Sequence, residues 1–141
     1  MSDLENAKQI LLEGGYTCVL CRGDTVYTAT ARGVKPLVDW LDSGLDLRGF
    51  SAADKVVGRA TAFLYVLLGV RTVHALVMST PAKEALEAGG IPAFCEQEVA
   101  GIINRRGDGP CPFEAAVLEI TEPTAALEAI RAKRIQMLGG N

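Results

Sequence analysis

Three short stretches of the sequence carry the side chains that are most able to bind a ligand or react with one. Carboxylate, ammonium and guanidinium groups pair with charged ligands, and a thiolate can act as a nucleophile. The basic residues in these stretches favour a small anionic ligand. The candidate residues are Asp54, Lys55, Thr80, Arg105, Arg106, Cys111 and Glu114.

Asp54 and Lys55 lie near the start of a predicted buried helix whose cap is Ser51. Ser51 and Asp54, three residues apart, form a pair similar to a capping box. In one interpretation Asp54 only caps the helix and Lys55 extends to solvent from the first turn. In the other, Lys55 faces a pocket and binds a carboxylate or a phosphate group.

Cys111 precedes Pro112, and proline is favoured at the first helical position. Cys111 is therefore the predicted N-cap of a helix, and Glu114 is its third residue. The positive end of a helix lowers the pKa of a thiol, which would make Cys111 nucleophilic. However, no histidine is near in sequence to act as its base, Glu114 opposes thiolate formation, and simple capping is the common role of such a residue.

Arg105 and Arg106 lie in a glycine-containing loop that leads into this helix. Two guanidinium groups beside free helix amides resemble an anion-binding arrangement. The alternative is a solvated turn with two surface charges. Arg-Gly-Asp occurs twice, starting at Arg22 and at Arg106, and we interpret both tripeptides as turns.

The cysteines and the single histidine do not form a metal-binding pattern. Cys18 and Cys21 are spaced as C-x-x-C, but they fall in a predicted strand, where residues three apart point to opposite faces. His74 also lies inside a predicted strand, where a local hydrogen bond is its expected role. We therefore predict neither a metal nor a cofactor, and reduced thiols.

Length and composition predict one globular domain over residues 1–141. The chain is 49% hydrophobic with a formal charge of −3, which does not indicate a nucleic-acid partner. Its most apolar segment, Ala60–Val70, is too short to cross a bilayer, and the N-terminus lacks a secretory signal pattern. We expect a cytoplasmic protein, and a homo-oligomer remains open.

The hydrophobic periodicity predicts an α/β fold with a hairpin and a parallel strand-helix-strand crossover. The predicted helices are Asp3–Glu13, Val34–Leu41, Ser51 to about Leu68, Pro81–Ala88, Pro112–Ile120 and Pro123–Leu138. The predicted strands are Tyr16–Cys21, Thr25–Thr30, Thr72–Met78 and Ile91–Cys95.

This order of elements resembles the cytidine-deaminase-like fold, a three-layer αβα sandwich with a mixed sheet of about four to five strands. Three stretches are also similar to a prokaryotic family of uncharacterised proteins that is grouped with this fold and has no assigned activity. The stretches are Asp54–Ala60 (DKVVGRA), Met78–Ala82 (MSTPA) and Ile103–Glu114 (INRRGDGPCPFE).

Zinc-dependent deamination needs a His or Cys with a Glu two residues later at one helix start, and Pro-Cys-x-x-Cys at the next. Here the first predicted start has Asp54 and Val56, and the second has Ala82 and Ala85 after Pro81. The resemblance therefore implies the fold without deaminase activity, and a pocket for a small anionic or nucleotide-like ligand. The alternatives are an enzyme with Cys111 or Lys55 as nucleophile and a non-enzymatic interaction subunit.

Overall fold

The structure, a computed structural model, describes residues 2–104 and 106–139. The helices in this part of the chain are α1 (Asp3–Gly14), α2 (Lys35–Ser43), α3 (Arg59–Leu68), α4 (Thr80–Ala88), α5 (Pro112–Ala116) and α6 (Pro123–Gly139). The strands are β1 (Cys18–Arg22), β2 (Thr25–Ala29), β3 (Ser51–Val57), β4 (Thr72–Ser79) and β5 (Ala93–Val99).

The strands form one mixed sheet in the order β2-β1-β3-β4-β5. β1 is antiparallel to β2 and to β3, whereas β3, β4 and β5 are parallel to one another. The predicted hairpin and the parallel pairing across α4 are both confirmed. The predicted α/β fold class with a mixed sheet is therefore correct.

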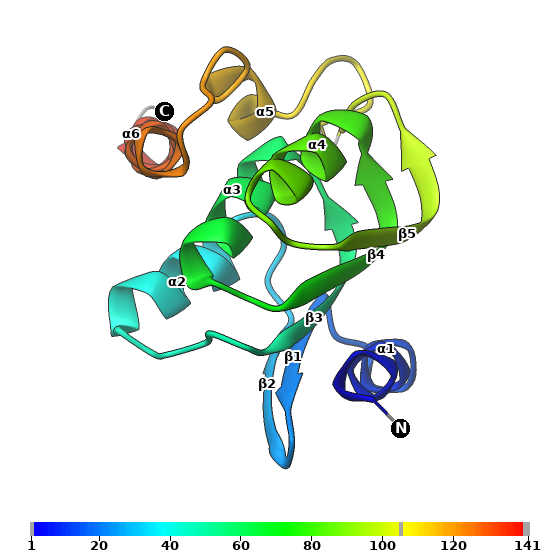
Figure 1. Cartoon of the computed structure of the whole chain (residues 1–141). Helices are drawn as coiled ribbons and strands as arrows, with labels where there is room; N and C mark the ends of the chain where they lie inside the picture. The colour runs from blue at the N-terminus through cyan, green and yellow to red at the C-terminus, as the bar shows by residue number, and fades with distance from the viewer. Residues whose placement is uncertain (1, 105, 140–141) are drawn as a thin grey trace.

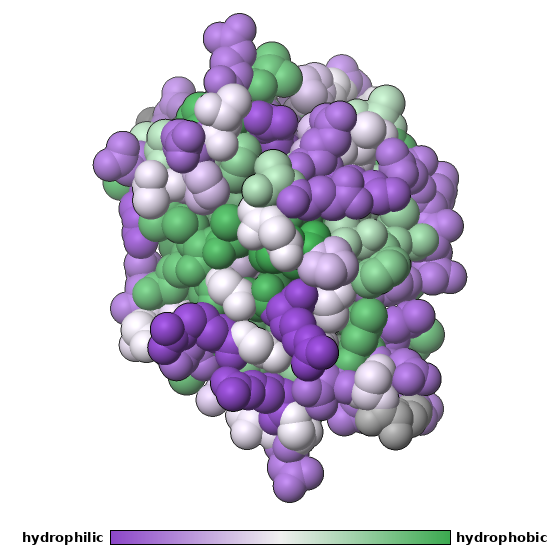
Figure 2. Space-filling view, viewed as in Figure 1, coloured by the Kyte–Doolittle hydropathy of each residue, from purple (hydrophilic) through white to green (hydrophobic). Residues whose placement is uncertain are grey.

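Helices cover both faces of the sheet (Figure 1). α1 packs alone on one face, against β1 and β3, with Ala7 and Leu11 buried there. The larger core lies on the other face, under α2, α3 and α4. α6 packs on α3 and α5 rather than on the sheet. Figure 2 shows apolar side chains gathered over α2 and α3, framed by hydrophilic ones.

The predicted helix from Ser51 is wrong over its first seven residues, which form the central strand β3. Ala52 packs in the larger core and Ala53 in the smaller one, so both faces of β3 are buried. A strand that is buried on both faces lacks the alternation of apolar and polar residues that identifies a strand. The helix begins at Arg59 instead, after the N-cap Gly58.

Other boundaries differ less. α1, α2, α4 and α6 lie within two residues of their predicted bounds, and Ser2 caps α1 through a capping box with Glu5. α5 ends at Ala116 rather than at Ile120, and β5 is shifted towards the C-terminus. Among the described residues, no helix combines the length and the apolar character that crossing a membrane requires.

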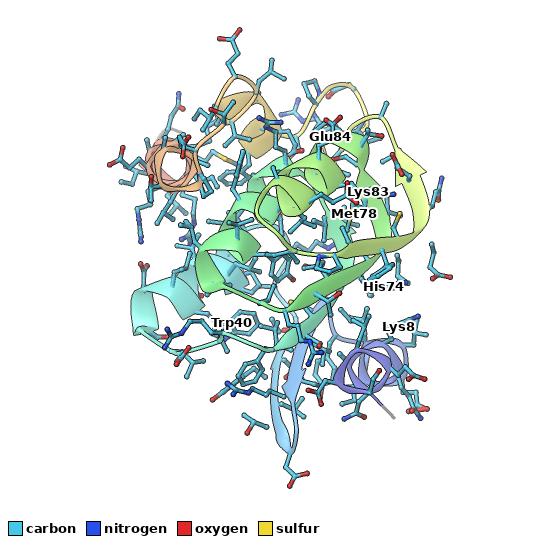
Figure 3. The ribbon with its side chains drawn as sticks, viewed as in Figure 1. Lys8, Trp40, His74, Met78, Lys83 and Glu84 are labelled. Atoms are coloured by element: carbon cyan, nitrogen blue, oxygen red, sulfur yellow. The ribbon has the colours of Figure 1, made fainter. Side chains whose placement is uncertain are left out.

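The predicted opposite orientation of Cys18 and Cys21 and the local hydrogen bond of His74 are confirmed. Cys18 belongs to the larger core and Cys21 to the smaller one, so their thiols lie on opposite faces of the sheet. His74 Nε2 lies 2.8 Å from Glu96 Oε2 on the neighbouring strand. Figure 3 shows His74 on the side of the sheet that carries α1 and Lys8.

Candidate functional site

A pocket of about 570 Å³ opens beside the end of β3 and the start of α3. A volume of this size is typical of sites for small molecules. Its walls come from the end of β3, the start of α3, the connection between β2 and α2, and the segment that leads into α5. The lining residues are Thr17, Thr30, Arg32, Gly33, Val34, Asp54, Lys55, Val56, Gly58, Ala60, Thr61, Ile102, Ile103, Cys111, Phe113 and Glu114.

Four of the seven candidate residues line this pocket, namely Asp54, Lys55, Cys111 and Glu114. Thr80 does not: it opens α4, where its hydroxyl donates a hydrogen bond of 2.7 Å to Glu98 Oε2. Arg106 is exposed in a turn and is not among the lining residues. Arg105 lies outside the described residues.

Asp54 has a different role from the predicted cap, because it lies inside β3 and is only 8% exposed. The Tyr65 hydroxyl donates a hydrogen bond of 2.6 Å to Oδ2, and the Val56 amide donates one of 3.3 Å to Oδ1. Burial raises the pKa of the Asp54 carboxyl from 3.8 to about 6, although these hydrogen bonds act in the opposite direction. Asp54 therefore changes charge near pH 6 within the wall of the pocket.

Tyr65 and Cys18 continue this buried polar cluster away from the pocket. Cys18 Sγ lies 3.0 Å from Tyr65 Oη. Burial raises the pKa of both groups well above the ordinary values, so both keep their protons at neutral pH. Since the Tyr65 hydroxyl donates its proton to Asp54, the Cys18 thiol is the donor to Tyr65. These two linked hydrogen bonds hold the Asp54 carboxyl in one orientation.

The Glu114 carboxylate binds the start of α3. Oε1 accepts a hydrogen bond of 2.7 Å from the Arg59 amide, and Oε2 accepts one of 2.9 Å from the Ala60 amide. An anion at the amino end of a helix pairs with free amides and with the positive end of the helix dipole. Gly58 is required for this contact, since a Cβ there would lie 2.6 Å from Glu114 Oε1.

Cys111 is the N-cap of α5 by position, but its side chain makes no capping hydrogen bond. Its backbone amide donates a hydrogen bond of 3.0 Å to the Ile102 carbonyl, which closes the segment at the edge of the pocket. The thiol is half-buried and has no hydrogen-bond partner among the described residues. Cys111 therefore lines the pocket, and no described residue forms a hydrogen bond with its thiol.

Arg32 and Lys55 are the two basic residues of the pocket wall, and both are exposed at its rim. Within the described part of the chain, neither has a carboxylate at ion-pair distance. Sequence reasoning missed Arg32, because it lies in the connection between β2 and α2 and belongs to no motif. The glycine after it, Gly33, was the one local signal of a turn at this position.

The sequence of this chain matches the model of a protein family described as a domain of unknown function (DUF1893) over residues 6–134. The chain belongs to this family. No specific activity is assigned to the family by this description. No curated protein sequence matches the chain significantly.

The fold is similar to a crystal structure of a DUF1893 family protein, TM1506, from Thermotoga maritima. The TM-score is 0.84 with 24% identity, and the similarity covers 94% of this chain and 91% of the other. Two more distant structures are a dCMP deaminase from the cyanophage S-TIM5 and a bifunctional enzyme from Thermotoga maritima. The latter is described as a diaminohydroxyphosphoribosylaminopyrimidine deaminase/5-amino-6-(5-phosphoribosylamino)uracil reductase.

The dCMP deaminase has a TM-score of 0.42 with 12% identity, over 55% of this chain and 77% of the other. The bifunctional enzyme has a TM-score of 0.43 with 13% identity, over 64% of this chain and 34% of the other. Within the described residues, no three His, Cys, Asp or Glu side chains are placed to hold a metal ion.

Proposed function

We propose that this protein is a binding domain for a small anionic, nucleotide-like molecule, which occupies the pocket beside β3 and α3. The observation that carries the proposal is a pair of exposed cations, Arg32 and Lys55, that line a partly apolar pocket and form no ion pair with the other described residues. A cytoplasmic location is consistent with the four free cysteines of the chain.

The charges around the pocket favour an anion at its rim. The Glu114 carboxylate is occupied by the amides of α3 and is not available to neutralise a basic side chain of the rim. Asp54 is buried below the rim and is held by Tyr65. Arg32 and Lys55 therefore keep their charges for a ligand, and charge-assisted hydrogen bonds to phosphate or carboxylate are among the stronger polar contacts.

The remaining walls suit a flat apolar body. Val34, Val56, Ile102, Ile103 and Phe113 contribute apolar surface to the pocket, and Ile103 is 66% exposed. Covering this surface with a ring would remove apolar area from water, which favours binding. A phosphate or carboxylate attached to a ring thus meets both kinds of wall at once.

The structure offers no support for a covalent reaction at Cys111 or Lys55. The Cys111 thiol has no hydrogen-bond partner among the described residues, and Lys55 is exposed rather than buried in apolar surroundings. A nucleophile normally needs a neighbouring base or a burial-lowered pKa. Reversible binding is therefore the better interpretation of both residues.

The proposal is tested by isothermal titration calorimetry and thermal unfolding with AMP, adenosine and inorganic phosphate. We expect AMP to bind and to raise the melting temperature more than adenosine or phosphate does at the same concentration. Added salt should weaken the response, because the rim cations are exposed and screened.

Arg32→Ala combined with Lys55→Ala should abolish the response to AMP. Arg71→Ala is the matched control. Arg71 is also exposed, but it directly precedes the start of β4 and is not among the residues that line the pocket. The proposal is wrong if AMP, adenosine and phosphate all fail to bind, or if the double variant responds as the unchanged protein does.

A further inference from the structure

We propose that Asp54 binds an amino group of the ligand, so that the molecule recognised is an anion that also carries an amino group. This inference rests on the proposed function, because it concerns the wall of the same pocket. It specifies the ligand class more narrowly than charge and size do. It also assigns Tyr65 as a positioning residue.

Asp54 contributes to the pocket lining although it is only 8% exposed. A carboxylate has about four lone-pair positions, and hydrogen bonds from Tyr65 and Val56 use two of them. The Lys55 amide and the Cys18 thiol also stabilise the charged form. The Lys55 amide donates to the Thr17 carbonyl and the Cys18 thiol lies 3.0 Å from Tyr65 Oη, so neither is committed to the carboxylate and a position remains for a donor on a ligand.

No basic side chain of the described residues forms an ion pair with Asp54. Burying a carboxylate without a cationic partner costs desolvation free energy, and each additional N–H donor offsets part of that cost. Among the described residues, the groups that stabilise the charged carboxylate are the Tyr65 hydroxyl, the Cys18 thiol and backbone amides. A ligand that brings an N–H group would complete the set, whereas a ligand that brings only acceptors would face the carboxylate with repulsion.

Tyr65 fixes the direction of the Asp54 carboxyl without contacting the ligand. It lies on α3, is fully buried, and is not among the residues that line the pocket. Its hydrogen bond to Oδ2 lowers the pKa of Asp54, and burial raises that pKa more strongly. Loss of the Tyr65 hydroxyl should therefore raise the pKa of Asp54 further.

The inferred contact needs the charged form of Asp54, so protons compete with the ligand below about pH 6. Among the described residues, the titratable or charged groups beside Asp54 are Cys18 on β1 and Tyr65 on α3, and those that share the pocket wall with it are Arg32, Lys55, Cys111 and Glu114.

The experiment compares nucleotides that differ only in an amino group. AMP is paired with purine riboside 5′-monophosphate, and GMP is paired with IMP. The phosphate group itself titrates near pH 6. Because both members of a pair carry the same phosphate, the ratio of their dissociation constants removes this effect. Calorimetry at pH 5, 6, 7 and 8 gives the ratio as a function of pH.

In at least one pair, we expect the amino-bearing nucleotide to bind about tenfold more tightly at pH 8, as a hydrogen bond to a charged group would provide. The preference should shrink as the pH falls through 6. In Asp54→Asn the ratio should lose its pH dependence. In Tyr65→Phe the decline should move to higher pH, which a purely structural role of Tyr65 would not produce. Asp42→Asn, at an exposed carboxylate outside the pocket, is the control.

The outcomes separate the two proposals. Equal binding within both pairs at every pH, together with a response that needs the phosphate group and the rim cations, would overturn the role of Asp54 and leave the proposed function standing. Absence of binding by all four nucleotides would overturn both. A preference that persists unchanged at pH 5 would also contradict the role of Asp54.

Discussion

Replacing Asp54 by Asn should change how the stability of the unliganded protein depends on pH. The Asp54 carboxyl is buried, and its pKa is about 6 in the fold against an ordinary value of 3.8. The folded state therefore binds more protons than the unfolded state between these values. As a result, the free energy of unfolding falls as the pH rises through this interval. Asn has a similar shape, accepts the Tyr65 hydrogen bond and does not titrate.

The magnitude follows from the two pKa values. One pKa unit corresponds to about 1.36 kcal/mol, so a difference of about two units gives roughly 3 kcal/mol. As the pH rises from 3.5 to 7.5, the free energy of unfolding of Asp54→Asn should increase by this amount relative to that of the unchanged protein. The absolute stability of the variant also includes its new amide N–H groups. The change with pH is the quantity predicted, because other titrating groups cancel in the difference.

Urea denaturation of both proteins at half-unit steps between pH 3.5 and pH 7.5 measures this difference. Asp42→Asn is the matched control, because a hydrogen bond from Arg131 lowers the pKa of Asp42. Its contribution to stability is therefore present at neutral pH and lost in acid, so this variant should change weakly and in the opposite direction. Parallel stability curves for Asp54→Asn and the unchanged protein would refute the reasoning.

Three further predictions concern other residues of the pocket and its surroundings. Glu114→Ala should destabilise the protein by about 1 to 3 kcal/mol, since two hydrogen bonds from backbone amides are lost. Gly58→Ala should cause little further destabilisation in the Glu114→Ala variant, because the side chain that its Cβ would approach is then absent. A double-mutant cycle measured by urea denaturation would show this. In the native protein, iodoacetamide should modify Cys111 and Cys95, whereas buried Cys18 and Cys21 should react only after unfolding, as mass spectrometry of the peptides would reveal. Arg106→Ala should leave the AMP affinity unchanged in calorimetry, because Arg106 is outside the pocket lining; a loss of binding would instead support the loop as the anion site.

The sequence predicts most of the fold because the outer elements carry clear local signals. α1 has a capping box at Ser2 and ends at paired glycines, and the hairpin has Gly23 with a φ of +59° in its turn. β4 and α4 follow directly from a β-rich run and a proline at a helix start. In each case a few neighbouring residues decide the structure, so that local reasoning is sufficient.

The central strand β3 could not be found in the same way. Its apolar residues serve two cores at once, and Ser51 and Asp54 happen to have the spacing of a capping box. Because a helix is predicted where β3 lies, the sequence places Asp54 at a helix start. Its hydrogen bond to Tyr65, eleven residues later, has no signal in the sequence. Arg32 was missed for a similar reason, because only the tertiary structure brings its loop to the pocket.

The contact of Glu114 with α3 bears on where an anionic ligand would bind. The start of a helix is a common anion site, yet the first amides of α3 are already bound to a carboxylate of the chain, 55 and 54 residues away in sequence. A ligand phosphate would have to displace this carboxylate, and with it the wall that α5 contributes to the pocket. The side chains of Arg32 and Lys55 have no such competitor among the described residues. The rim of the pocket, rather than the helix start itself, is therefore the position at which an anion costs the fold least.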